Sequence, residues 1–277
     1  MILYYAVGGG LGHLTRGRRV LELLDLESRA AFVTASTYAR DVRVTGSIPV
    51  IDVPHDLERK PAEHHAWLRD LVRDRGADRL IADAFPAGIQ GELSGLPVAM
   101  DYVARILRLD EYRSAVSGEM PRFETTWVVE ELTADHAAFV HAHSDRVAIL
   151  DLAPKYEAAL TPSDFWLIVH SGPEDEVREL IEYATNLRDL AAQKPERILI
   201  ASRCEVTLPP GFESTNEVPA SRLFPAAARI ISAAGFNIMC ETAPWAGKHH
   251  VIPFARRFDD QYLRAARRRV LGSVPSQ

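Results

Sequence analysis

Apolar and polar positions follow two alternating patterns along almost the whole chain. Residues 2–7 form a short apolar run that fits a buried strand, and it stops at a cluster of glycines. Residues 14–24 fit a helix, because Leu14 and Leu21 fall on one helical face while Arg16 does not. Short strands that alternate with amphipathic helices are typical of a parallel sheet covered by helices, so the pattern predicts the α/β fold class.

The predicted elements form two sets separated by a linker. Residues 103–144 are rich in charge and predicted to be mostly helical, and prolines at 154 and 162 mark the linker. The strand–helix pattern then restarts, which predicts two α/β domains at 1–162 and 163–277. Predicted strands cover residues 2–7, 30–34, 50–53, 79–82, 97–100, 146–150, 166–169, 197–201, 229–233 and 250–254, with a weak strand near 217–218. Predicted helices cover residues 14–24, 64–75, 174–192, 235–245 and 259–270.

Composition narrows the class of protein. The 277 residues are 47% hydrophobic and 25% charged, which is ordinary for a globular protein and excludes disorder and coiled-coil rods. The net charge of −6 argues against a nucleic-acid partner. Two cysteines exclude a disulfide scaffold and favour a reducing compartment. The chain has no apolar run of the roughly 20 residues that span a membrane, and its start lacks a basic leader, so we expect a soluble, cytoplasmic protein.

The first candidate site is the glycine-rich loop at residues 8–16, between a predicted strand and a predicted helix. Gly10 and Gly12 would let the backbone approach a ligand, and the free amides at a helix start favour an anion. The glycine spacing does not match the dinucleotide-binding fingerprint. His13 lies in the first helical turn, where it could act as a general base. A helix-capping turn with an incidental histidine is an equally good interpretation of this loop alone.

The second candidate site combines residues 230–241 with residues 251–261. Gly235, Phe236 and Asn237 follow a predicted strand and open a helix, where backbone amides can bind a phosphate. Glu241, one turn later, could accept hydrogen bonds from two ribose hydroxyls. Asp260 and Gln261 begin the last helix and carry groups suited to sugar hydroxyls. Taken singly, each residue could have a purely structural role, such as a helix cap at Asn237. A structural role explains the whole set, on consecutive strand ends, much less well.

These two motifs together resemble the GT-B glycosyltransferases, in particular the superfamily of the lipid II N-acetylglucosaminyltransferase. The resemblance covers both halves, and the late motif is the more specific. It implies two Rossmann-like domains facing a cleft, with acceptor binding in residues 1–162 and nucleotide-sugar binding in residues 163–277. It also implies inverting, metal-independent transfer from a nucleotide diphosphate sugar, with UDP expected, to a hydroxyl of a small or lipid-linked acceptor. No separate cofactor is expected.

The resemblance assigns further roles by position. His13 would be the catalytic base, and Asp83 or Asp101, each at the end of a predicted strand, would orient it or contact the acceptor. A helix cap is an equally good interpretation of each aspartate. The residues expected to contact the nucleotide sugar are Gly10, Gly12, Ser171, Gly172, Val218, Phe224, Gly235, Phe236, Asn237, Glu241, Asp260 and Gln261.

Two other functions fit the same residues. The compact chain and its Gly-x-Gly-His-x-x-Arg loop are similar to nucleotide-sugar hydrolases of this fold, in which water replaces the acceptor. The second of these functions is that of a non-catalytic protein that binds a sugar nucleotide. The histidine pairs at 64–65, 141–143 and 249–250 lack a metal-ligand spacing, so no metal site is expected. Residues 267–269 are basic and could contact anionic lipid at a membrane surface, although a solvated helix face explains them better.

Overall fold

The structure is a computed structural model that describes residues 1–8, 10–154, 163–191 and 195–272. It divides into two compact units. The N-terminal unit comprises Met1–Leu152 and Arg257–Asp259, and the C-terminal unit comprises Ala153–Arg256 and Asp260–Gln277. The predicted linker proline at 162, the predicted domain boundary beside it, the predicted helix end at 192 and Gly9 lie outside the described residues.

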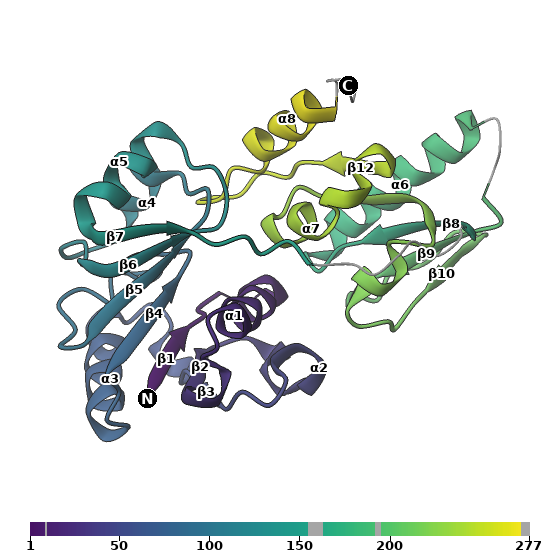
Figure 1. Cartoon of the computed structure of the whole chain (residues 1–277). Helices are drawn as coiled ribbons and strands as arrows, with labels where there is room; N and C mark the ends of the chain where they lie inside the picture. The colour runs from purple at the N-terminus through teal and green to yellow at the C-terminus, as the bar shows by residue number, and fades with distance from the viewer. Residues whose placement is uncertain (9, 155–162, 192–194, 273–277) are drawn as a thin grey trace. The chain divides into compact units, whose positions relative to one another are not determined.

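The N-terminal unit is built on a seven-stranded sheet in the order β3-β2-β1-β4-β5-β6-β7, and every neighbouring pair is parallel (Figure 1). The strands are β1 Ile2–Tyr5, β2 Ala30–Thr34, β3 Val50–Asp52, β4 Arg79–Asp83, β5 Ala99–Ala104, β6 Phe123–Val128 and β7 Ser144–Ile149. The helices are α1 Leu11–Leu23, α2 Val42–Thr45, α3 Pro61–Asp74, α4 Leu109–Ala115 and α5 Ala134–His143.

The C-terminal unit has a five-stranded parallel sheet in the order β10-β9-β8-β11-β12. The strands are β8 Ser163–Val169, β9 Arg197–Ala201, β10 Phe212–Ser214, β11 Ala227–Ala233 and β12 His249–Ile252. The helices are α6 Glu174–Leu190, α7 Phe236–Glu241 and α8 Gln261–Gly272. Short 3-10 helices in the two units cover Glu27–Arg29, Thr37–Arg40, His55–Leu57, Ala220–Leu223 and Ala243–Lys248.

Three predicted elements were wrong. The stretch 103–144 contains strand β6 as well as two helices, because β6 carries polar residues that interrupt its apolar run. The weak strand near 217–218 does not form, and β10 lies earlier at Phe212–Ser214. Helix α7 ends at Glu241 and does not continue to Trp245, and a separate 3-10 helix that starts at Ala243 carries Pro244 in its first turn. Proline has no N–H to continue the α-helical hydrogen bonds.

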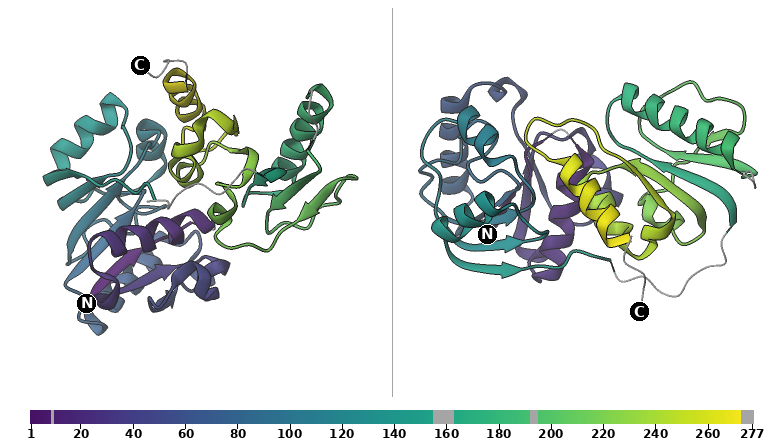
Figure 2. Two further views of the ribbon diagram at one scale, coloured as in Figure 1. Left: turned by 45° about the vertical axis from the view of Figure 1, so that its right-hand side comes forward. Right: turned by 90° about the horizontal axis from the view of Figure 1, so that it is seen from above.

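Helices α1 and α3 cover opposite faces of the N-terminal sheet (Figure 2), as the two tyrosines of β1 show. Tyr4 faces α1, and the Tyr5 hydroxyl lies 3.2 Å from His64 Nε2 of α3. A Cβ at Gly17 of α1 would lie 2.6 Å from the Tyr4 ring and 2.7 Å from the Phe32 ring. Only glycine lets α1 lie this close to the sheet, which places the first turn of α1 beside the carboxyl end of β4.

Helix α8 holds α7 in place through arginine side chains. Arg264 donates to the Ala234 carbonyl at 2.8 Å. Arg268 donates to the carbonyls of Met239 and Thr242 at the end of α7, where a cation also interacts favourably with the helix dipole. Burial lowers the pKa of Arg268. Arg268, which belongs to the basic run 267–269, therefore has a packing role.

Among the described helices, none combines the length and the apolar composition that crossing a membrane requires.

Candidate active site and nucleotide-binding residues

His13 projects from the first turn of α1, immediately after the loop that leaves β1. Gly10 is the N-cap of this helix, and a Cβ there would meet no atom within 4 Å. Gly12 lies inside the first turn, where its carbonyl accepts from the Thr15 hydroxyl. Gly8 has a φ of +150°, and a Cβ there would lie 2.6 Å from His13 Nε2. The loop therefore needs glycine at position 8 to make room for the His13 ring.

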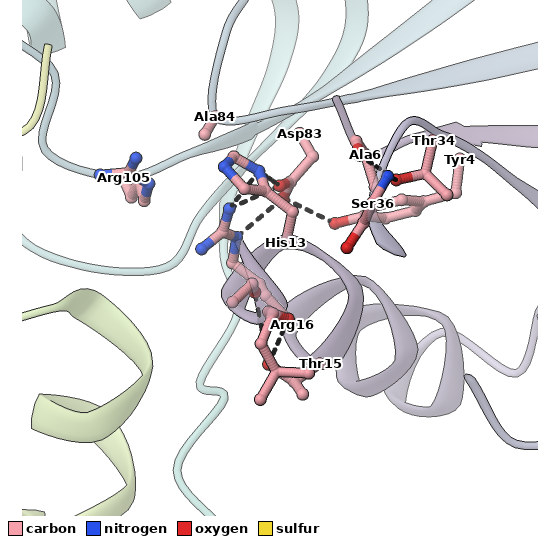
Figure 3. A network of polar contacts seen from close by, with 12 residues as sticks. Tyr4, Ala6, His13, Thr15, Arg16, Thr34, Ser36, Asp83, Ala84 and Arg105 are labelled. Atoms are coloured by element: carbon pink, nitrogen blue, oxygen red, sulfur yellow. Dashed lines mark hydrogen bonds and ion pairs between the residues drawn. The ribbon is translucent and has the colours of Figure 1, made fainter. Parts of the chain in front are cut away.

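Asp83, the last residue of β4, accepts hydrogen bonds from three side chains (Figure 3). His13 Nδ1 lies 2.6 Å from Asp83 Oδ2. Arg16 donates through Nε to Oδ1 at 2.7 Å and through its NH2 group to Oδ2 at 2.5 Å. The Tyr4 hydroxyl donates to Oδ1 at 2.9 Å. The carboxylate is fully buried, so these four donors replace the water that it has lost.

The charges of this cluster define the protonation state of His13. Burial alone would raise the pKa of Asp83, but the Arg16 charge and the hydrogen bonds from His13 and Arg16 hold that pKa well below its usual range. An ionised carboxylate can only accept, so Nδ1 of His13 must carry the proton that bonds to it. Burial, together with the charges of Arg16 and Arg105, lowers the pKa of His13 although Asp83 opposes this. His13 is therefore neutral at pH 7 and keeps the basic lone pair on Nε2.

Phe85 forms an aromatic wall beside the histidine. Its ring stacks on the His13 ring with centroids 5.8 Å apart, and on the other side it stacks on Tyr112 at 5.9 Å. Ala84, which links Asp83 to Phe85, has a φ of +65°, a left-handed conformation that costs a residue with a Cβ about 1–3 kcal/mol. Such strain persists only where the surroundings hold it, and here Tyr102 donates to the Ala84 carbonyl.

Of the two aspartates predicted to orient His13, only Asp83 reaches it. The expectation that Asp101 ends a strand was wrong, because β5 runs from Ala99 to Ala104 and Asp101 lies inside it. Its carboxylate accepts from Arg79 at 2.7 Å and from the Thr125 amide at 3.0 Å. Asp101 therefore joins three neighbouring strands and has a structural role.

Sequence reasoning missed three residues of this cluster, namely Tyr4, Arg16 and Phe85. Arg16 was placed off the apolar face of its helix, yet its side chain is buried. A signal existed, because residues three apart lie on the same helical face and His13 and Arg16 are so spaced. Tyr4 and Phe85 gave no comparable signal, since their positions depend on pairing between distant strands.

In the C-terminal unit, the predicted residues gather at the carboxyl ends of three adjacent strands, as ligand sites do in open α/β sheets. Ser171 and Gly172 follow β8, with Ser171 exposed. Gly235 is the N-cap of α7 after β11, and Asn237 is partly exposed in the first turn. Phe236, between them, is buried.

Asp260 and Gln261 follow β12 and each has a structural partner. Asp260 Oδ1 accepts from the Leu263 amide at 2.9 Å, as an N-cap does. Gln261 is buried, and its Oε1 accepts from the amide of Ala234 at 3.2 Å and from that of Phe254 at 3.0 Å. Gln261 thus joins the loops that follow β11 and β12.

The remaining predicted residues differ in their surroundings. Phe224 is fully buried among core residues and packs edge-on against Trp245, so its ring has no surface for a ligand. Val218 is partly exposed in the loop after β10 and precedes a cis bond to Pro219. Glu241 is the last residue of α7, and burial raises the pKa of its carboxyl to about 7.

A second buried cluster lies beside Ser171 and Gly172. His170 Nε2 is 2.7 Å from Glu176 Oε2, and Arg256 donates to both oxygens of Glu176. A Cβ at Gly172 would lie 2.3 Å from His170 Nε2, so glycine is needed here for packing against His170. Within the residues that the structure describes, no group of three or more His, Cys, Asp or Glu side chains could hold a metal ion.

Among known proteins, the chain matches solved structures but not sequence families. No protein-family model matches it, and no curated protein does so. The spinosyn forosaminyltransferase SpnP aligns over 98% of this chain and 83% of its own, with 13% identity and a TM-score of 0.59. UGT2 of Phytolacca americana, complexed with UDP-2fluoro-glucose and pterostilbene, aligns over 96% and 82%, with 13% identity and a TM-score of 0.59. The spinosyn rhamnosyltransferase SpnG, complexed with thymidine diphosphate, aligns over 99% and 92%, with 10% identity and a TM-score of 0.50.

These structures define the fold class. Two parallel sheets with flanking helices match the GT-B glycosyltransferase fold, as the sequence predicted. The structural neighbours are consistently glycosyltransferases of that type.

Proposed function

We propose that the protein is an inverting glycosyltransferase in which His13 is the general base. The observation that carries this proposal is the hydrogen bond of 2.6 Å between His13 Nδ1 and buried Asp83. It fixes the tautomer that leaves Nε2 basic, and burial keeps the ring neutral at pH 7. A neutral imidazole oriented by a carboxylate is the arrangement that general-base catalysis needs.

The proposed reaction is a single displacement. Nε2 of His13 takes the proton of an acceptor hydroxyl while its oxygen forms a bond to the anomeric carbon of the donor sugar. The bond from that carbon to the diphosphate breaks, and the diphosphate leaves with the electron pair. Such a displacement inverts the anomeric carbon and needs no enzyme nucleophile. Asp83 stabilises the imidazolium that forms and remains ionised.

The donor is assigned to the C-terminal unit, with UDP as the expected nucleotide. Backbone amides from Gly235 to Asn237 would bind the diphosphate and stabilise its developing charge, which would make a metal ion unnecessary. Glu241 would accept from the ribose hydroxyls, and Asp260 from the donor sugar. Support comes from the position of residues 235–237 directly after β11 and of Asp260 in the segment after β12. Two structural neighbours are complexes with UDP-2fluoro-glucose and with thymidine diphosphate, so both UDP and TDP belong in the test.

Two measurements test this function. Thermal unfolding in the presence of UDP, TDP, GDP or CMP should show stabilisation by one diphosphate, by the mass action of a ligand that binds only the folded protein. With the sugar form of that nucleotide, release of the diphosphate should depend on an added acceptor. Release at full rate without an acceptor would identify a hydrolase. Binding without release under every acceptor would identify a non-catalytic binding protein.

A further inference from the structure

Glu176, in the first turn of α6, joins two segments that are far apart in the sequence. His170, directly after β8, has its Nε2 atom 2.7 Å from Glu176 Oε2. Arg256, in the segment after β12, donates to both oxygens of the same carboxylate. These three residues, the Glu176 cluster, all belong to the C-terminal unit. The proposed reaction gives none of them a role.

Hydrogen bonds fix the geometry of the Glu176 cluster. The side chains of Glu176 and His170 are almost completely buried, at 11% and 6% exposure. Burial lowers the pKa of His170, although Glu176 opposes this, so the ring is neutral at pH 7. A carboxylate can only accept, so Nε2 carries the proton that bonds to it. The guanidinium fork of Arg256 matches both carboxylate oxygens, and such a bidentate contact fixes orientation as well as charge.

The contact between His170 and Glu176 closes a short loop. Ser171 and Gly172, which the sequence predicts to contact the nucleotide sugar, lie between these two residues in the chain. Cys204, after β9, holds the same loop from another side, because its thiol donates to the Gly172 carbonyl at 3.1 Å. A Cβ at Gly172 would lie 2.3 Å from His170 Nε2 and 2.9 Å from Glu176 Oε2. The backbone of the loop therefore packs directly on the Glu176 cluster.

The Glu176 cluster also links the two sides of β11. Strand β11 lies between β8 and β12 in the sheet, and Glu176 joins the loop after β8 to the segment after β12. Gln261 adds the loop after β11, because its Oε1 accepts from the amides of Ala234 and Phe254. Two buried side chains, Glu176 and Gln261, thus tie together the three segments in which predicted donor residues lie.

A buried ion pair explains position better than stability. Moving a carboxylate and a guanidinium out of water is so unfavourable that apolar residues of similar volume often give equal or greater stability. Apolar surroundings are present here, since the Phe254 ring lies 5.6 Å from the His170 ring and belongs to the hydrophobic core of this unit. The bidentate pair between Glu176 and Arg256 instead specifies one arrangement of two segments.

We propose that Glu176 is a positioning residue for the donor: through His170 and Arg256 it holds the segments after β8 and β12 where a nucleotide diphosphate needs them. This inference rests on the proposed function, which assigns the donor to the C-terminal unit. Glu176 itself does not contact the donor, since its carboxylate is buried and each oxygen has a donor within the protein.

The first experiment compares Glu176→Gln with Glu174→Gln. Both variants remove one negative charge from the first turn of α6, a change that by itself favours an anionic ligand. Glu174 is the matched control, because its side chain is half-exposed and pairs with Arg178 of the same helix. Any gain in affinity in Glu174→Gln therefore measures the electrostatic part of the change.

The measurement is a calorimetric titration with UDP, or with TDP or GDP where that diphosphate stabilises the wild-type protein. Glu176→Gln should bind about tenfold more weakly than the wild type, because small displacements of binding groups are costly. Glu174→Gln should bind as tightly as the wild type or slightly more tightly. Affinity in Glu176→Gln that equals or exceeds that of Glu174→Gln overturns the inference and leaves the donor site. A wild-type protein that binds none of the three diphosphates overturns both proposals.

Steady-state kinetics separates positioning from a role in the chemical step. With the sugar form of that diphosphate as donor, Glu176→Gln should raise the donor KM about tenfold and change kcat by less than about twofold. The reason is that His13 and Asp83 belong to the other unit and keep their contacts. A fall in kcat at unchanged KM contradicts the inference, since it would assign Glu176 to the transition state.

A double variant guards against a simple failure to fold. Glu176→Met combined with Arg256→Met replaces the ion pair by two apolar side chains, so it should unfold at a temperature equal to or above that of Glu176→Gln. We nevertheless expect it to bind the same diphosphate about tenfold more weakly than the wild type, because the bidentate contact is lost. A stable double variant with wild-type affinity would show that the pair serves packing alone, and the inference would be wrong.

Discussion

Replacing Arg16 with methionine should convert His13 from a weak base into a stronger one. Methionine keeps much of the side-chain volume but removes the charge and all donors to Asp83. Two unit charges 3.2 Å apart, the distance from the Arg16 NH2 group to His13 Nδ1, interact by about 5 kcal/mol at an effective dielectric of about 20. That value is an upper bound, because the guanidinium charge is spread out and burial still opposes protonation. We expect the pKa of His13 to rise by about one to two units, above its ordinary value.

The assay is the pH dependence of kcat/KM. In the wild-type protein burial lowers the pKa of His13, so the acid limb of the profile should lie below the ordinary range of a histidine. In Arg16→Met, His13 is protonated at neutral pH, and the acid limb of the profile should move to higher pH by the same one to two units. Arg19→Met is the matched control, because Arg19 lies on the same helix and pairs with Glu22. Its profile should not move. An unchanged acid limb in Arg16→Met would refute the role given to Arg16.

The same variant should change how stability depends on pH. A histidine whose folded pKa lies above its unfolded value stabilises the protein below the unfolded pKa, and that stability is lost as the pH rises through the folded pKa. Arg16→Met should therefore be most stable in mild acid, where protonated His13 still pairs with Asp83. Above the raised pKa, buried Asp83 loses its last cation and the variant should unfold at lower temperature.

Three further predictions follow from the geometry. Gly8→Ala should cut turnover at least tenfold at unchanged nucleotide affinity, because its Cβ would enter the space of His13 Nε2; wild-type turnover would contradict this. Burial lowers the pKa of His136 to about 4 and that of His249 to about 3. Both histidines must therefore stay neutral in the folded protein, and each should reduce the free energy of unfolding by about 2 kcal/mol between pH 7.5 and pH 5 in urea titrations. His249→Asn should lessen this loss. Glu241→Ala should weaken UDP binding about tenfold by calorimetry, and wild-type affinity should rise with pH through about 7 as the Glu241 carboxyl ionises.

Much of the fold follows from local sequence patterns. Strands β2 and β9 have the predicted bounds, because each contains a short apolar run that is buried in a parallel sheet. Strand β6 was missed, since the three consecutive polar residues 124–126 interrupt its apolar run inside a charged stretch. Asp101 was misplaced because β5 continues beyond this aspartate, whose carboxylate pairs with Arg79 of the neighbouring strand β4.

The candidate site was predictable only where its residues share a motif. His13 follows from a glycine-rich loop at a helix start, and Asp83 from a carboxylate at the end of a strand. Phe85 could not be assigned, because its place beside His13 depends on long-range packing. Arg16 was missed although its three-residue spacing from His13 indicates a shared helical face. Phe224, expected near the nucleotide, is packed in the core, and its place relative to the nucleotide stays a prediction.

The central claim is that His13 is the catalytic base, and one paired measurement tests it most directly. Turnover of the donor and its dissociation constant should be measured side by side for the wild-type protein and for His13→Ala. The account predicts that turnover falls about a hundredfold or more while the dissociation constant is unchanged, because a general base contributes to the transition state and not to donor binding. Turnover that persists in His13→Ala at wild-type donor affinity would contradict the account.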